Sequence, residues 1–341
     1  DAYDDVTFEK MFQSILQMPK RDYPAFMGGL KVASGVEYPL ESPVDYTVRF
    51  GILQEQEVGV GEAMVSAAER VFPEWSAKSP AERVEIFERV YGALTQQRYR
   101  LAATVLLSTG MTRQESLAEV DFLLDAIAPE INRAAEVRPR PKGVWAVCST
   151  YSTPLAAPMA YAIVAMLAGN TVVVQPDDRC PTAVYMVYDI CAKCGVPAGV
   201  FNLYTDRKPK TMIDLANDTR LKGVVATGMG QVMEDMMFLM VDDELGFVNE
   251  IKGMNPIVVY RPSDVRKAAE DAVDSAFRYM GQGVFSTSKV IVTIEDQKRF
   301  MDAVMEKVNN LRVTDPAEQD AFCGPLISFE MGKRYTRYLE E

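Results

Sequence analysis

Apolar residues recur at helical spacing through much of the first half of the chain. The segment SPAE (Ser79–Glu82) has the form of a capping box with proline at the first helical position. The apolar positions behind it are Ile86, Phe87, Val90, Tyr91 and Leu94. The same spacing predicts helices over about residues 99–107, ending near Gly110, and over about residues 116–135. Residues 1–60 are irregular and strand-rich instead, and TVRFGIL is their clearest strand candidate.

After a break at residues 138–143, short apolar strands alternate with helices. The strand candidates are VWAVCS, TVVVQP, VFNLY, GVVAT, PIVVY and SKVIVTI. The helix candidates are about residues 154–167, 183–193, 210–217 and 264–280, the last capped by Ser263, one from about residue 296, and one at the end of the chain. Because these strands are apolar on both faces, they are typical of a parallel sheet covered by helices on both sides. The pattern predicts a two-domain α/β protein whose ligands bind beyond the carboxyl ends of the strands.

Composition and charge narrow the class of protein. The 341 residues are 48% apolar and 25% charged, which is ordinary for a globular protein of about two domains. The formal net charge of −12 argues against binding to nucleic-acid phosphates and against docking on anionic lipid. The longest apolar stretch, residues 154–169, contains Pro158 and is short for a membrane span, so a buried helix is expected. An odd, sparse set of five cysteines and an opening without a signal-peptide pattern favour the cytoplasm.

The chain contains no histidine, and this excludes several kinds of site. Ser-His-Asp triads, Cys-His pairs and histidine-ligated metal centres cannot be built within it. Cys191 and Cys194 form a CxxC, but no second pair accompanies it, and zinc needs four ligands. We therefore expect no metal, and we expect these thiols to lie in the core or at its boundary.

Several longer segments carry a family resemblance. PKGVWAVCSTYSTPLAAPMAYAIVAMLAGNTVVVQPDD, CGVPAGVFNLY, GVVATG, NEIKGMNPIVVY, MGQGVFSTSKVIV and CGPLIS follow one another in this order. In order and spacing they resemble the aldehyde dehydrogenase superfamily, and the N-terminal extension with SPVDYT is most similar to the 1-pyrroline-5-carboxylate (glutamate semialdehyde) dehydrogenases. The resemblance implies a Rossmann-like parallel-sheet cofactor domain (residues 1–252) and a second, C-terminally incomplete α/β catalytic-type domain (residues 253–341). Whether the remainder of such a fold is disordered, cleaved away or supplied by another chain stays open.

The resemblance also assigns catalytic positions, and their residues depart from the family pattern. The family places a nucleophilic cysteine after GQ-x, where this chain has Val284. A valine side chain cannot become a nucleophile, and the nearest hydroxyls are those of Ser286 and Thr287. Glu250 stands at the general-base position, on an expected loop, and Ser152 replaces the asparagine that donates to the oxyanion.

The cofactor positions implied by the family are altered as well. Gln175 and Asp178 stand where the family holds the adenosine ribose, and Asp178 would favour NAD over NADP. Thr227, Gly228 and Met229 stand at a helix start near the pyrophosphate. No GxGxxG follows the first strand of the alternating region, so the common dinucleotide fingerprint is missing. Lys252 replaces a glycine at a close backbone approach.

Changes at many positions together favour a catalytically inactive relative of these enzymes. We interpret the chain as a structural or regulatory subunit of a homo- or hetero-oligomer. An active relative is one candidate for the partner in a hetero-oligomer. One alternative is an NAD-dependent aldehyde (1-pyrroline-5-carboxylate or semialdehyde) dehydrogenase that oxidises an aldehyde to a carboxylate, or a variant of such an enzyme that uses a non-cysteine route. A second alternative is a small-molecule or NAD sensor that keeps the pocket without chemistry.

Overall fold

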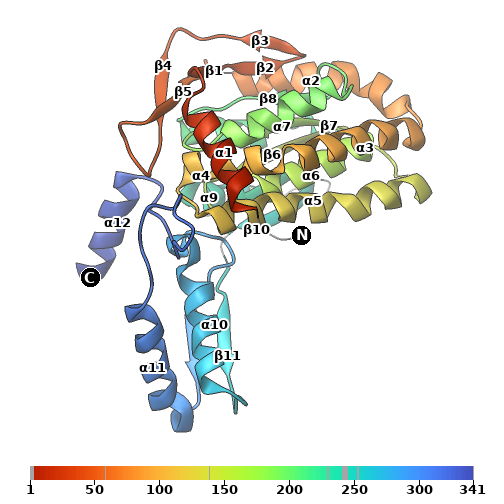
Figure 1. The fold of residues 1–341 in the computed structure, drawn as a ribbon. Coiled ribbons are helices and arrows are strands. Elements are labelled where there is room, and N and C mark those ends of the chain that lie inside the picture. The colour runs from red at the N-terminus through yellow and green to blue at the C-terminus, as the bar shows by residue number, and fades with distance from the viewer. Residues whose placement is uncertain are drawn as a thin grey trace.

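The main body of the protein is built on a seven-stranded sheet in the order β10-β9-β6-β7-β8-β2-β3 (Figure 1). The computed structural model describes residues 4–57, 59–137, 139–228, 230–239, 245–251 and 253–340. The strands of this sheet are β2 (Ala25–Met27), β3 (Leu30–Val32), β6 (Val144–Ser149), β7 (Thr171–Gln175), β8 (Phe201–Leu203), β9 (Leu221–Gly228) and β10 (Gly246–Ile251). Strands β6 to β10 pair in parallel, as the apolar strand pattern predicts for β6 to β9, whereas β10 was not predicted. The antiparallel strands β2 and β3, which extend one edge, were not predicted.

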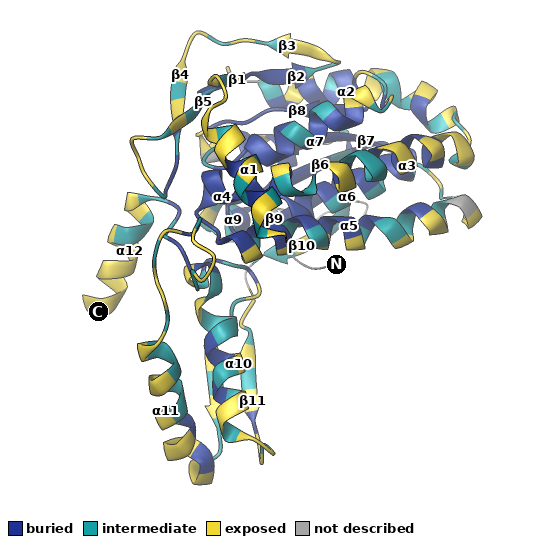
Figure 2. Cartoon of the chain, viewed as in Figure 1, coloured by how far each residue is buried: buried dark blue, intermediate teal, exposed yellow. Residues whose placement is uncertain are grey.

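Both faces of the parallel sheet are covered, and alternate strand residues enter two separate hydrophobic clusters. On β7, Val172 and Val174 belong to one cluster and Val173 to the other. Helices α3 to α7 cover mainly the first face, and α2, α8 and α9 cover the second, so the buried residues gather in this part of the molecule (Figure 2). These helices are α2 (Val60–Ala77), α3 (Pro80–Gln96), α4 (Arg98–Thr109), α5 (Arg113–Glu136), α6 (Ala156–Leu167), α7 (Thr182–Lys193), α8 (Pro209–Ala216) and α9 (Gln231–Leu239). The prediction of a doubly covered parallel sheet is confirmed.

Local sequence signals fix the helix ends. The predicted capping box is present, because Ser79 accepts from the Glu82 N–H while the Glu82 carboxylate accepts from the Ser79 N–H. A second box at Thr112 and Glu115 begins α5. Gly110 ends α4 with φ of 74°, a conformation that glycine adopts without steric cost.

The N-terminal region differs from the prediction. Residues 5–16 form a helix, α1 (Asp5–Leu16), where irregular structure was expected. Asp4 caps it by accepting from the Val6 and Thr7 N–H groups at 3.1 and 3.2 Å. The buried stripe consists of only Phe8 and Phe12, so its helical period is too short to stand out in the sequence. The strand predicted from TVRFGIL is present as β5 (Arg49–Gln54), which lies between β1 (Arg21–Tyr23) and β4 (Glu37–Glu41).

The C-terminal elements form a smaller unit that projects from the main body (Figure 1). It contains β11 (Pro256–Val259), α10 (Val265–Phe277), β12 (Lys289–Val292) and α11 (Ile294–Asn309), and α12 (Phe329–Glu340) ends the chain. Strands β11 and β12 pair in parallel, and one face of the pair packs on α10 and α11 through Val259, Ala269, Ala272 and Phe300. The cap of α10 is Asp264 and not Ser263 as predicted, since the Asp264 carboxylate reaches the Lys267 N–H.

The other face of the small sheet is open. Val258 and Ile291 are 66% and 51% exposed on it. Lys252, where the sequence divides the two predicted domains, lies outside the described residues, so the boundary itself stays a prediction. Within the described residues, no helix is both long and apolar enough to cross a membrane.

Candidate functional site

The order of the parallel strands reverses at β6. The chain proceeds outward through β7 and β8 and then returns to the other side of β6 with β9 and β10. Loops leaving the strands at such a switch point part in opposite directions, and ligands bind in the crevice between them. Here the loop that joins β6 to α6 (residues 150–155) contributes walls to two cavities. We call the first, of about 440 Å³, the strand-end cavity, and the second, of about 430 Å³, the loop cavity.

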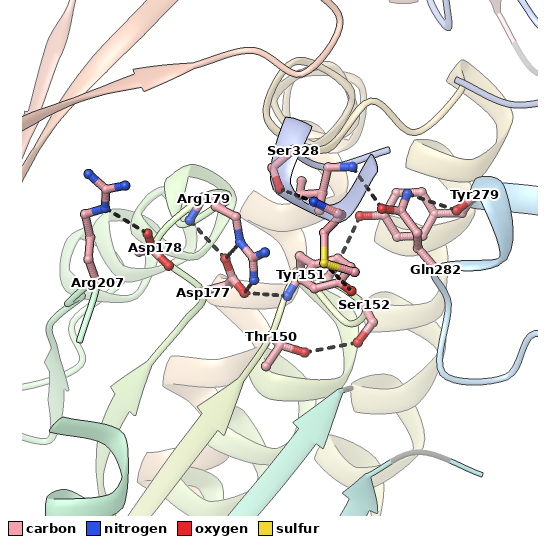
Figure 3. A network of polar contacts seen from close by, with 12 residues as sticks. Thr150, Tyr151, Ser152, Asp177, Asp178, Arg179, Arg207, Tyr279, Gln282 and Ser328 are labelled. Carbon is pink, nitrogen blue, oxygen red and sulfur yellow. Dashed lines mark hydrogen bonds and ion pairs between the residues drawn. The ribbon is translucent and has the colours of Figure 1, made fainter. Parts of the chain in front are cut away.

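Charged side chains that follow the carboxyl ends of β7 and β8 line the strand-end cavity (Figure 3). Asp177 forms a two-pronged ion pair with the Arg179 guanidinium at 2.7 and 2.6 Å and accepts from the Tyr151 N–H at 2.9 Å. Burial alone would raise the pKa of Asp177, but the Arg179 charge and these hydrogen bonds hold it below its ordinary value. Arg179 also lies over the Tyr151 ring, 4.4 Å from its centroid. These contacts fix the polar wall of the cavity before any ligand arrives.

Asp178 faces a different balance of forces. Its only ion pair among the described residues is with Arg207, at 3.5 Å. Burial and the neighbouring Asp177 charge raise the pKa of Asp178 to about 6. The predicted acceptor for a ribose hydroxyl therefore lines the cavity and ionises less readily than an ordinary aspartate.

Gln175 is held by the protein itself. Its side chain lines the strand-end cavity but is only 1% exposed. Its oxygen accepts from the Tyr204 hydroxyl at 2.7 Å, and its amide donates to the Thr211 hydroxyl at 3.0 Å. The uncharged Gln175 amide therefore uses its oxygen and one N–H on two buried hydroxyls, so fewer of its hydrogen-bonding groups are available to a ligand.

The predicted pyrophosphate segment is packed against the β6–α6 loop. The Thr227 hydroxyl is fully buried and shares a hydrogen bond of 2.9 Å with Thr153. Gly228 has φ of 109°, and a Cβ atom there would lie 2.1 Å from Thr150 Oγ1. The structure therefore places Thr227 and Gly228 at the switch point. Met229, the third predicted residue, lies outside the described residues.

Ser152 and Val284 meet in the loop cavity, as their predicted shared role requires. Val284 is 6% exposed, and its carbonyl accepts from Asn255 at 2.8 Å. Ser152 lies 3.1 Å from the Thr150 hydroxyl (Figure 3). Most of the remaining wall is apolar, with Phe122 and Phe285 among its members. The cavity has the size and the lining of a site for a small organic molecule.

Two carboxylates that the sequence analysis missed also line the loop cavity. Glu119 of α5 accepts from the Leu155 and Ala156 N–H groups at 3.1 and 2.8 Å and so caps α6, which has no cap from its own chain neighbours. Burial raises the pKa of Glu119 against the opposing effect of these two hydrogen bonds. Glu115, already used in the capping box of α5, accepts from the Tyr279 N–H at 2.7 Å. The T-x-x-E pattern was a readable signal for Glu115, but no local pattern marks Glu119.

The backbone after α10 is strained next to this cavity. Tyr279 and Met280 have φ of 51° and 52°, values that cost a residue with a side chain about 1–3 kcal/mol each. The Tyr279 hydroxyl donates to the Tyr151 carbonyl at 3.0 Å and anchors this turn to the β6–α6 loop (Figure 3). The strained turn thereby aims residues 283–286 at the loop cavity.

Glu250 is not where the sequence analysis expected it. It lies on the edge strand β10, paired with Thr227 of β9, and not on a loop. Its carboxylate accepts a hydrogen bond from the Tyr161 hydroxyl of α6, and burial followed by this contact raises the pKa of that tyrosine. Glu250 is not among the described residues that line either cavity. The structure thus places Ser152 and Val284 in one cavity, whereas Glu250 lies outside it and pairs with Tyr161 of α6.

The cysteines behave as the spacing analysis expected. Cys191 is buried, Cys194 is half-buried, and both are free thiols. Burial raises the pKa of Cys148 to about 12, which keeps that thiol protonated and unreactive at neutral pH. Among the described residues, no group of acidic, cysteine or histidine side chains has the arrangement of a metal site.

Comparison with known proteins identifies the architecture. The chain is 24% identical to a 1-pyrroline-5-carboxylate dehydrogenase of Geobacillus sp. (strain WCH70) over 98% of its own length and 69% of that protein. It is 26% identical to the alpha-ketoglutaric semialdehyde dehydrogenase of Bacillus subtilis (strain 168), over 94% of this chain and 69% of the relative. A structure of 1-pyrroline-5-carboxylate dehydrogenase from Thermus with bound NAD superimposes with a TM-score of 0.90 at 22% identity, covering 98% of this chain and 69% of that one.

These matches confirm the resemblance to 1-pyrroline-5-carboxylate dehydrogenases and the aldehyde dehydrogenase fold. The chain spans about two thirds of the length of these relatives. The model of the aldehyde dehydrogenase family matches residues 32–341. The chain belongs to the aldehyde dehydrogenase family.

Proposed function

We propose that this chain is an aldehyde-dehydrogenase-type protein that performs no dehydrogenase chemistry and acts as a structural or regulatory subunit. The observation that carries the proposal is Val284 in the wall of the loop cavity, at the position that the family resemblance gives to the nucleophile. Covalent aldehyde oxidation needs an atom that can attack a carbonyl at neutral pH, and an isopropyl group offers none.

The neighbouring hydroxyls make poor substitutes. The Thr287 hydroxyl is engaged with Ser275 at 2.6 Å. Ser286 does line the loop cavity, but within the described part of the chain no hydrogen bond joins its hydroxyl to a carboxylate. A serine nucleophile requires such a base within hydrogen-bond reach. The Glu250 carboxylate is turned to Tyr161 instead.

NAD is the ligand that we propose for the strand-end cavity. Its volume of about 440 Å³ and its position at the carboxyl ends of the strands suit the adenosine end of a dinucleotide. Asp178 would accept from ribose hydroxyls, and Arg207 and Lys208 would meet phosphate charge. NAD supplies a hydride acceptor when bound to an active relative, whereas here the residues serve binding alone.

The subunit role rests on the open face of the small C-terminal sheet. Val258 and Ile291 present apolar side chains to solvent there, next to strand edges that have no partner among the described residues. Such a face is suited to a homo-oligomer or to a hetero-oligomer with an active family member. Native mass spectrometry of a cell extract tests this role, and a chain found only as a free monomer would count against it.

Turnover assays test the absence of chemistry. The purified wild-type chain, Val284→Cys and the matched control Val284→Ala would each be mixed with NAD and 1-pyrroline-5-carboxylate, and NADH absorbance followed. We expect no NADH from the wild type or from the alanine variant, and turnover in the cysteine variant if the oxyanion and cofactor geometry are intact. NADH formation by the wild type would refute the proposal. If Ser286→Ala then abolished that activity, the chain would be a dehydrogenase that uses Ser286 as its nucleophile.

A further inference from the structure

A third, smaller cavity lies apart from the two described above, where the end of α1, strands β1 and β5 and helices α4 and α7 come together. We call it the arginine-rimmed cavity, because Arg21 of β1, Arg49 of β5 and Arg100 of α4 all line it. Its volume is about 110 Å³, a few times the ~30 Å³ that a water molecule occupies in the liquid. A cavity of this size excludes a nucleotide and admits only a short ligand.

Three arginines around one small cavity are unusual in a chain of net charge −12. Arg21 forms an ion pair with Asp189 at 2.7 Å, and Arg49 forms one with Glu41 at 3.1 Å. Arg100 forms no ion pair within the described residues, and its guanidinium donates to the Met18 sulfur at 3.5 Å. The rim therefore carries one guanidinium charge that no carboxylate of the described residues compensates.

The inner part of this cavity is lined by apolar side chains and by two buried threonines, Thr104 and Thr182, of which Thr104 donates its hydroxyl to the Arg100 carbonyl at 2.9 Å. Leu107 and Tyr23 are 4% and 8% exposed there. Thr182, also in the wall, is 1% exposed, and its hydroxyl is buried without a hydrogen-bond partner in the described structure. A buried hydroxyl without a partner is costly, so its presence beside a cavity points to a ligand that supplies the missing contact.

We propose that the arginine-rimmed cavity binds a short-chain carboxylate. Guanidinium groups match the planar, two-oxygen geometry of a carboxylate, so Arg100 would hold the charged end at the rim. A chain of three or so carbons would then lie on Leu107 and Tyr23. Inorganic phosphate is also an anion but has no apolar part, so it would leave this inner wall unfilled. The inference is independent of whether the loop cavity is catalytic.

Calorimetric titration of the purified chain with sodium butyrate at low ionic strength tests this site. We expect a dissociation constant on the order of 1 mM, as suits a ligand of so few atoms, and no binding of n-butanol, butylammonium or inorganic phosphate at that concentration. Arg100→Gln should weaken butyrate binding at least about tenfold, since it removes the charge and keeps much of the side-chain length. Arg70→Gln is the matched control, because Arg70 is also exposed but lines none of the three cavities.

The variant Thr182→Val tests whether the Thr182 hydroxyl contacts the ligand or is only an unpaired group in the core. Removing an unpartnered hydroxyl should leave the melting temperature unchanged or raise it, so loss of binding cannot be blamed on unfolding. We expect binding to weaken about fivefold in this variant. Butyrate binding that is unaffected by Arg100→Gln, phosphate binding as tight as butyrate, or no butyrate heat at about 20 mM ligand would each overturn the proposal.

Discussion

Replacing Asp178 by asparagine should stabilise the protein much more at neutral pH than at acidic pH. The folded-state pKa of Asp178 is about 6, against an ordinary value of 3.8, because burial and the Asp177 charge oppose its ionisation. A carboxyl whose pKa is raised on folding favours the folded state below its unfolded pKa, and that advantage is lost as the pH rises through the folded pKa. At 1.36 kcal/mol per unit, ionised Asp178 costs the folded state up to about 3 kcal/mol above pH 6.

The assay is urea unfolding of the wild type and Asp178→Asn at several values between about pH 4.5 and pH 7.5. The difference between the two free energies of unfolding cancels the other titrating groups. We expect it to be about 1 kcal/mol in favour of the variant at about pH 4.5, where an ordinary carboxyl is already largely ionised, and to rise to about 3 kcal/mol at neutral pH. Asp214→Asn serves as a control, since Asp214 forms an exposed pair with Lys210 on α8 and should give a small difference.

A difference that stays constant over this pH range would refute the reasoning, because it would show that Asp178 titrates alike in the folded and unfolded states. An Asp178→Asn variant that is less stable at neutral pH would refute it more strongly. In that case the ion pair with Arg207 would outweigh the cost of burial.

Three further substitutions test the polar contacts of the switch point. Gln175→Leu removes the nearer acceptor of the buried Tyr204 hydroxyl and leaves it only the Thr211 carbonyl at 3.3 Å. The free energy of unfolding should fall by about 0.5–1.5 kcal/mol in urea titration, and an unchanged midpoint would contradict the network. Gly228→Ala puts a Cβ atom 2.1 Å from Thr150 Oγ1 at φ of 109°. We expect the free energy of unfolding to fall by more than about 2 kcal/mol, or no soluble protein. A wild-type melting temperature would show that the loop around Thr150 moves aside easily. Tyr161→Phe removes the hydrogen bond to the carboxylate on β10 and should cost about 1 kcal/mol, and a cost near zero would mean that water replaces the contact.

Periodicity predicted the elements that carry long, regular patterns. The boundaries of α3 and α4 and the parallel strands β6 to β9 agree with the sequence analysis to within a few residues, because capping signals and doubly buried apolar runs are local. Helix α1 and strand β10 were missed since each has few buried residues, and β10 is an edge strand with mixed exposure. Local pattern is least informative at edges, where neighbours far along the chain decide the structure.

The candidate site was predictable only as far as the family motifs reach. The meeting of Ser152 and Val284 in one cavity agrees with the roles implied by the resemblance. Glu119 could not be found in this way, because its contact with the start of α6 joins residues more than thirty positions apart, at Leu155 and Ala156. Glu250 was placed on a loop because its motif was read without its pairing partner on β9.

The small sheet formed by β11 and β12 also has a consequence for the motions of the chain. It is two-stranded, and its own hydrophobic cluster has few fully buried members, whereas the seven-stranded sheet is covered on both faces. Parallel strand pairs rarely stand alone, and local opening is easiest where few apolar contacts protect the backbone hydrogen bonds. The amides of β11 and β12 should therefore exchange with solvent deuterium through local openings, long before those of β6 and β7, which open only with the whole domain. The small sheet and the seven-stranded sheet would therefore open as separate cooperative units, although they belong to one chain.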